Sequence, residues 1–303
     1  MIAVRPPHRR PRPARRAPLA RVVVHPDLLH EIATASARAG RCETGGPLLG
    51  TIQHSWDGPV PTPIVALLGT VAPGPDVDAH PARVALGRAG DGERAAAALR
   101  WLRSASGLDL QHVGDWHKHP AGHPHPSPGD RATARAMSRE RGGAVWLVAV
   151  TVGERSARFG TEIDDEAIRR VADRSQVDEI RIYEADPQEG LVLSTVAVDG
   201  CALPRLPRLP WHLAQPGRFA AECRLLTAAG YAVSLKALLG SDGPVVELRL
   251  DHEDRGELSV VTGPGFPAEP PALRDGRGRL LPTLDHWSPA RFLLDVVEER
   301  WRR

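Results

Sequence analysis

Three successive segments decide the fold: DLQHVGDWHKH (residues 109–119), PGDRATARAMSRERG (128–142) and AVWLVAVTV (144–152). The first is strand-like, and the second places a proline at the first position of an expected helix. The third is apolar almost without interruption, which is typical of a strand buried on both faces. A strand, a helix and a strand in this order favour an α/β domain with a central sheet.

The residues before these segments extend the same alternation. Short apolar runs bounded by Gly and Pro predict strands at 19–26, 46–53 and 63–71. Apolar side chains at helical spacing predict helices at 26–40, ending at Gly40, and at 92–105. We therefore expect one α/β domain over residues 18–195.

The bulk composition bounds the remaining possibilities. Residues 1–17 hold six arginines, several prolines and no acid, so we expect a disordered basic arm. The rest of the chain is slightly acidic, and we expect no nucleic-acid partner for it. No run approaches the roughly 18 apolar residues of a membrane span, so we expect a cytoplasmic protein without a membrane partner. Three widely separated cysteines, an odd number, argue against a disulfide framework.

The C-terminal third has a different organisation. Residues 201–218 contain prolines at short intervals, which predicts an extended linker over 196–216 and a second domain over 217–303. In that domain we expect a helix at 219–230, strands at 244–250 and 257–262, and a proline-rich bend at 263–273. A last helix is expected to begin with Ser288 as its cap and Pro289 at its first position.

The stretch HKHPAGHPHPSPGD, residues 117–130, carries the candidate chemistry. Residues two apart on a strand share a face, so His117 and His119 form an imidazole pair suited to zinc. Asp130, at the start of the next helix, is the natural third ligand. The same residues have a second explanation, because Ser127 and Asp130 form a helix capping box that needs no metal.

The spacing His117-x-His119, seven residues, Ser127, two residues, Asp130 resembles the H-x-H-x7-S-x2-D motif of the JAMM (MPN-plus) metalloprotease family. That family also requires an upstream glutamate, which Glu43 in ETGGPLLG supplies in a form similar to bacterial members. The resemblance covers about two thirds of the chain. It implies a cytidine-deaminase-like JAMM/MPN domain with a central mixed sheet, of the α/β class.

The resemblance also implies a role for each residue. His117, His119 and Asp130 would hold Zn²⁺, with water completing the site. Glu43 would take a proton from that water and pass it to the leaving amine. Ser127 would hydrogen-bond the oxyanion of the tetrahedral intermediate.

Other polar residues of this stretch have weaker assignments. Asp115 shares the strand face of His117, and we expect it to orient a ligand imidazole from behind. His112 lies at an odd offset from the pair and is expected to face away from it. His123 and His125 fall inside the seven-residue spacer and are expected to be solvent-exposed loop residues.

The C-terminal part resembles the ubiquitin-conjugating-enzyme superfold and its RWD relatives, which are smaller α+β domains. The resemblance rests on an opening helix, a strand meander, the bend Phe266–Pro271 (F-P-x-E-P-P) and the W-S-P of Trp287–Pro289. No cysteine lies between these two motifs, so the domain is expected to bind rather than conjugate. Ordinary loop chemistry also explains both motifs.

Together the two resemblances imply a zinc-dependent isopeptidase that cleaves the amide after the C-terminal tail of a ubiquitin-like modifier, in deconjugation or in precursor maturation. Expected partners are that modifier or its conjugates and a cognate activating or conjugating enzyme. Two alternatives stay open. One is a JAMM hydrolase that trims a sulfur-carrier protein, and the other is a non-catalytic two-domain scaffold.

Overall fold

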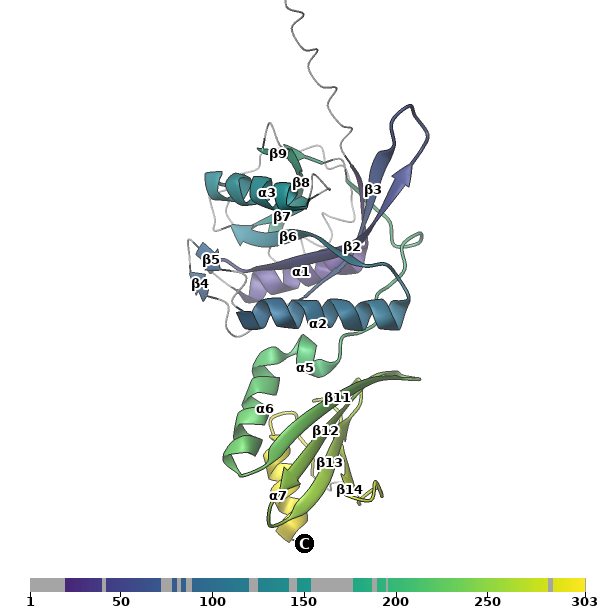
Figure 1. The fold of residues 1–303 in the computed structure, drawn as a ribbon. Coiled ribbons are helices and arrows are strands. Elements are labelled where there is room, and N and C mark those ends of the chain that lie inside the picture. The colour runs from purple at the N-terminus through teal and green to yellow at the C-terminus, as the bar shows by residue number, and fades with distance from the viewer. Residues whose placement is uncertain are drawn as a thin grey trace, which may run out of the picture.

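The computed structural model describes residues 20–39, 42–71, 78–80, 83–85, 89–119, 125–141, 146–153, 177–186, 190–194, 196–282 and 286–302 (Figure 1). The arm expected at residues 1–17 lies outside these ranges.

The N-terminal domain is built on a large mixed sheet. Its eight described strands have the order β10-β1-β3-β2-β6-β7-β8-β9. Their bounds are β1 Arg21–Val24, β2 Gly45–Ser55, β3 Thr62–Thr70, β6 Gln111–His119, β7 Leu147–Gly153, β8 Val177–Asp186, β9 Gly190–Leu193 and β10 Val196–Val198. β1 runs parallel to β3 and β10, β6 runs parallel to β7, and the other neighbouring pairs are antiparallel. This confirms the expected mixed α/β domain.

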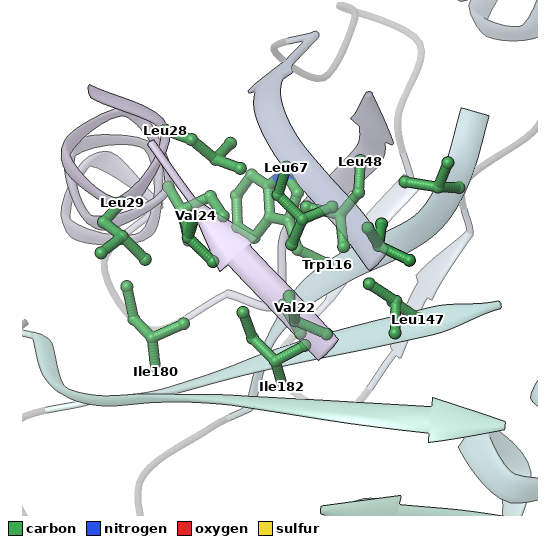
Figure 2. Packing of buried hydrophobic residues seen from close by; sticks show 14 of the residues in the cluster. Val22, Val24, Leu28, Leu29, Leu48, Leu67, Trp116, Leu147, Ile180 and Ile182 are labelled. Atoms are coloured by element: carbon green, nitrogen blue, oxygen red, sulfur yellow. The ribbon is translucent and has the colours of Figure 1, made fainter. Parts of the chain in front are cut away.

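Helix α1 (Pro26–Arg38) covers one face of this sheet. Its buried Leu28, Leu29 and Ile32 lie on one side of the helix, as the spacing predicts, and pack against inward side chains of the strands. Figure 2 shows Trp116 of β6 at the centre of this core, and its side chain is fully buried. This core also includes side chains of β7 and β8, so α1 packs against strands from both halves of the sheet.

Helices α2 (Ala89–Ser106) and α3 (Pro128–Glu140) lie on the opposite face. Ala98 and Leu102 of α2 pack with Leu49 and Leu68 of β2 and β3. Ala134 of α3 packs with side chains of β7, β8 and β9. Two short strands, β4 (Asp78–His80) and β5 (Arg83–Ala85), pair with each other before α2.

The C-terminal domain is a four-stranded antiparallel sheet with helices. Helix α6 (Pro216–Ala228) precedes the strands β11 (Ala232–Gly240), β12 (Gly243–His252), β13 (Gly256–Thr262) and β14 (Ala272–Asp275), which pair in chain order. Helix α7 (Leu293–Arg302) follows. Leu226 of α6 and Val296 and Val297 of α7 share one core with the inward side chains of the sheet.

The last helix begins later than the sequence predicts. Ser288 and Pro289 belong to a turn, in which the Arg291 amide donates to the Ser288 carbonyl over 3.0 Å. The helix starts at Leu293, whose amide donates to the buried Glu222 carboxylate of α6 over 2.8 Å. A distant acid therefore replaces the expected serine cap.

The segment between the domains is packed against both. β10 lies within the range expected to be linker and adds a strand to the large sheet. Leu203, Leu206 and Leu209 then pack on the α2 side of the N-terminal domain, together with Leu213 of α5 (Trp211–Ala214). Trp211 belongs to the C-terminal core instead and donates from Nε1 to Thr262 Oγ1 over 2.8 Å.

The cysteines Cys42, Cys201 and Cys223 are free. Across the described helices, none combines the length and the apolar composition needed to cross a lipid bilayer.

Candidate metal centre

Strand β6 brings two imidazoles to one face of the sheet. It lies between β2 and β7, and its central residues pair with both neighbours. Trp116 and Lys118 point to the α1 side, where Lys118 Nζ donates to the Ser36 carbonyl over 2.9 Å. His117 and His119 alternate with them and so point to the side of α3. Their Nε2 atoms are 2.7 Å apart.

The third residue of the cluster comes from the first turn of α3. Asp130 Oδ2 is 3.2 Å from His119 Nε2, and Oδ1 is 3.4 Å from His117 Nε2. These three side chains are the one described group of His, Cys, Asp and Glu whose candidate ligand atoms lie within 4.8 Å of one another. The structure thus brings together the three residues that the spacing selects.

The donor set fits zinc. Donor atoms about 2.0–2.1 Å from a tetrahedral zinc lie about 3.3 Å from one another. The two imidazole–carboxylate distances of 3.2 and 3.4 Å match this spacing. The two histidine nitrogens are closer than that because they hydrogen-bond each other. Two imidazoles and one carboxylate are also a common protein ligand set of catalytic zinc sites.

The charge state of Asp130 suits the same role. Burial works to raise the pKa of the Asp130 carboxyl, but hydrogen bonds with the two histidines and Ser127 outweigh burial. The pKa therefore lies well below its ordinary value, and the carboxylate is ionised at neutral pH, as a zinc ligand must be.

Ser127 is the N-cap of α3, as the sequence predicts. Its Oγ accepts from the Asp130 amide over 3.2 Å, and its own amide donates to Asp130 Oδ2 over 2.5 Å. The capping box is real, and it orients the carboxylate that faces the histidines. Because Oγ acts as an acceptor in this cap, its proton remains able to hydrogen-bond a ligand.

Glu43 lies on the segment leading into β2, beside the end of β6. The Thr44 carbonyl accepts from the Lys118 amide over 2.7 Å, and Gly45 pairs with His117. The Glu43 backbone is therefore adjacent to the imidazole pair, although its carboxylate is not part of the three-residue group.

The glycine next to this segment has a packing role. A Cβ at Gly46 would lie 2.6 Å from the Val71 carbonyl oxygen and 3.1 Å from Trp116 Nε1. Trp116 Nε1 donates to Thr70 Oγ1, which in turn donates to the Pro47 carbonyl. These close neighbours explain the glycine at this position through its contact with the core.

A β-bulge corrects the expected orientation of His112. The β2–β6 register shifts so that Gly114 pairs with Leu48 and His112 with Leu49, which leaves Val113 as the extra residue. The alternation of side chains between the two faces of the strand shifts by one residue at the bulge. His112 therefore lies on the same face as Asp115, and its Nε2 is 2.9 Å from Asp115 Oδ1. His112 was therefore wrongly assigned to the opposite face. The contact recorded for Asp115 is with this histidine rather than with His117.

One contact near the cluster has no counterpart in the sequence-based assignments. His125 is exposed, as expected, yet its Nδ1 lies 3.2 Å from Nη1 of the buried Arg181 on β8. Nothing in the local sequence links two residues 56 positions apart. His123 lies outside the described residues.

Comparison with known proteins assigns the domain. Residues 25–161 match a family model described as prokaryotic homologs of the JAB domain, and this part of the chain is a JAB/MPN domain. The C-terminal domain is unassigned. No curated protein matches the chain.

Among solved structures, the solution structure of protein DSY2949 from Desulfitobacterium hafniense is 13% identical, with a TM-score of 0.36. The alignment covers 59% of this chain and 92% of that chain. This similarity is too low to indicate a shared fold.

Proposed function

We propose, on the premise that residues 25–161 form a prokaryotic JAB domain, that the protein is a zinc-dependent isopeptidase or peptidase. The observation that carries the proposal is the convergence of His117, His119 and Asp130 on one face of the sheet within that domain. Their spacing of 3.2 and 3.4 Å and the ionised carboxylate support a metal-binding role.

The three residues would hold zinc, which when bound supplies a Lewis acid that polarises a carbonyl and makes hydroxide available near neutral pH. The chain itself must then move protons and stabilise charge. Glu43, whose backbone runs beside β6, is the proposed base that accepts a proton from the attacking water and returns it to the leaving amine.

Ser127 is the proposed oxyanion partner. Its hydroxyl lies at the exposed start of α3, one turn of chain from the Asp130 carboxylate. In the capping box Oγ accepts a hydrogen bond, which leaves its proton to donate to a tetrahedral oxyanion. The cap also keeps this hydroxyl in a fixed position before substrate arrives.

We infer the substrate class from the domain combination. The C-terminal domain contains two short motifs that resemble those of ubiquitin-conjugating enzymes and RWD domains, and it has an antiparallel sheet with helices. The proposed substrate is the amide bond after the C-terminal tail of a ubiquitin-like modifier, in a conjugate or a precursor. The C-terminal domain would then bind the modifier or a cognate activating or conjugating enzyme.

The test combines metal analysis with a cleavage assay. Elemental analysis of the purified chain is expected to find one zinc per chain, and Glu43→Gln is expected to keep it. The same variant is expected to cleave a fusion protein that carries a ubiquitin-like modifier at its N-terminus on the order of 10²–10⁴ times more slowly. Glu140→Gln, at an exposed position of α3, is the matched control and should cleave normally.

Wild-type protein without zinc, or a Glu43→Gln variant as fast as wild type, would contradict the proposal. A sulfur-carrier protein with a C-terminal extension forms a second substrate arm. Cleavage of that substrate alone would keep the metal chemistry and replace the substrate class.

A further inference from the structure

A buried arginine lies on the same face of the sheet as the metal-binding group. His117 of β6 pairs with Val150 of β7, and Val150 pairs with Arg181 of β8. Residues opposite each other in a ladder share a face, and two strand spacings put the Arg181 backbone about 10 Å from that of His117. Arg181 is only 2% exposed, so it makes no contact with a substrate in solution.

The guanidinium is directed to the segment that leads into α3. Arg181 Nη1 lies 3.2 Å from His125 Nδ1. A guanidinium has only donors, so Nδ1 must be the acceptor and the ring proton lies on Nε2. This charge-assisted bond fixes one end of a short segment. Pro126 is buried, and Ser127 is tied into the capping box, so the segment is held at three consecutive residues.

The geometry points to Arg181 as a positioning residue, which acts through His125 to place Ser127 and Asp130. The effect on zinc binding and catalysis rests on the proposed function, whereas the effect on the position of the α3 start does not. The path is short: Arg181 holds His125, and two residues later the Ser127 amide donates to Asp130 Oδ2 over 2.5 Å. Displacement of His125 would therefore shift the start of α3 relative to the imidazoles on β6.

The start of α3 needs a contact that holds it in place relative to β6. The seven residues between His119 and Ser127 connect a proposed ligand on the sheet to the helix that carries the third proposed ligand, Asp130. Both ends must keep their spacing for three donor atoms to bind one ion. Ala134, through which α3 packs with β7, β8 and β9, lies a turn further along the helix than Ser127 and Asp130.

The test is a double-mutant cycle on zinc affinity, measured by competition with a chromogenic chelator. Arg181→Met and His125→Ala are each expected to weaken zinc binding about tenfold, the lower range for residues that orient metal ligands. The double variant is expected to be no weaker than either single one, because both break the same link. Arg181→Lys, which keeps a cationic donor, should recover part of the loss.

Arg181 also makes an interaction other than the one with His125. The cycle separates the two, because only the loss that acts through His125 disappears when His125 is already replaced. Arg139→Ala, at an exposed position on α3, is the matched control and should bind zinc normally. Thermal unfolding of each metal-free variant shows whether the chain is folded at the assay temperature.

Hydrogen exchange of the metal-free protein supplies a measurement that does not depend on zinc. Arg181→Met is expected to speed exchange at the Asp130 and Arg131 amides, which bond to Ser127 Oγ and the Ser127 carbonyl, about tenfold. Unchanged exchange there, or single losses of zinc affinity that multiply in the double variant, would overturn the inference. Wild-type protein that binds no zinc while exchange responds as expected would overturn the proposed function alone.

Discussion

Replacement of the buried Glu222 by alanine is expected to destabilise the C-terminal domain strongly. Glu222 on α6 is fully buried and holds two donors at once. Its Oε1 accepts from Arg218 Nε over 2.6 Å, and its Oε2 accepts from the Leu293 amide over 2.8 Å. The same carboxylate therefore pairs with a cation and caps the start of α7.

The expected cost follows from what the substitution leaves behind. Glu222→Ala removes one partner of a buried ion pair and leaves the Leu293 amide without its acceptor, which predicts a loss of about 3–5 kcal/mol in the free energy of unfolding. Burial raises the pKa of the Glu222 carboxyl, and the hydrogen bonds from the Leu293 amide and Arg218 offset this only in part. Glu222→Gln keeps the volume and one acceptor and should cost about 1–2 kcal/mol.

The matched control is the half-exposed pair between Arg255 and Glu298, whose side chains are 34% and 27% exposed. Glu298→Ala should cost no more than about 1 kcal/mol, because solvent screens such pairs. Urea unfolding of the full chain, read by hydrogen exchange over residues 216–302, measures this domain separately from the other. Equal losses for Glu222→Ala and Glu298→Ala would refute the reasoning.

Two further predictions concern the N-terminal domain and the segment that joins the domains. A Cβ at Gly114 would lie 2.0 Å from the Leu147 carbonyl oxygen. Gly114→Ala should therefore cost roughly 3 kcal/mol in urea unfolding, whereas Gly92→Ala, with open space around it in α2, should be neutral or stabilising. Burial lowers the pKa of His212 to about 4, and its Nδ1 lacks a partner in the described structure. The unfolded chain binds this proton at about pH 6.5, so stability falls as the pH drops below that value, by at most about 2 kcal/mol between about pH 7.5 and pH 5. Partial exposure of the ring reduces this figure, and His212→Gln should remove this part of the pH dependence; an unchanged pH dependence would contradict the assignment.

Much of the candidate metal centre was predictable from short spacings. Alternation on a strand puts His117 and His119 on one face, and a helix cap puts Asp130 at the first turn of the following helix. Both rules depend only on neighbouring residues, and the structure shows the shared face and the helix cap that they predict. Ser127 illustrates the same point, since its cap and its proposed catalytic role belong to one hydroxyl.

Local rules failed at two positions, the face of His112 and the start of the last helix. One extra residue in β6 reversed the side of His112, because a bulge shifts the two-residue period of a strand. The last helix begins at Leu293 rather than Pro289, because Glu222 from another helix caps it. The leucines between the domains pack on the α2 side, which their proline-rich surroundings did not indicate.

The sequence by itself determined the order of the elements, the ligand spacing and the choice of His117, His119 and Asp130, since these depend on repeat periods and on helix capping. Only the tertiary structure decided that Arg181 meets His125 and that the segment before β2 lies beside the imidazole pair. Such contacts join residues that are far apart along the chain. They depend on which strands become neighbours in the sheet, and no local pattern encodes that neighbourhood.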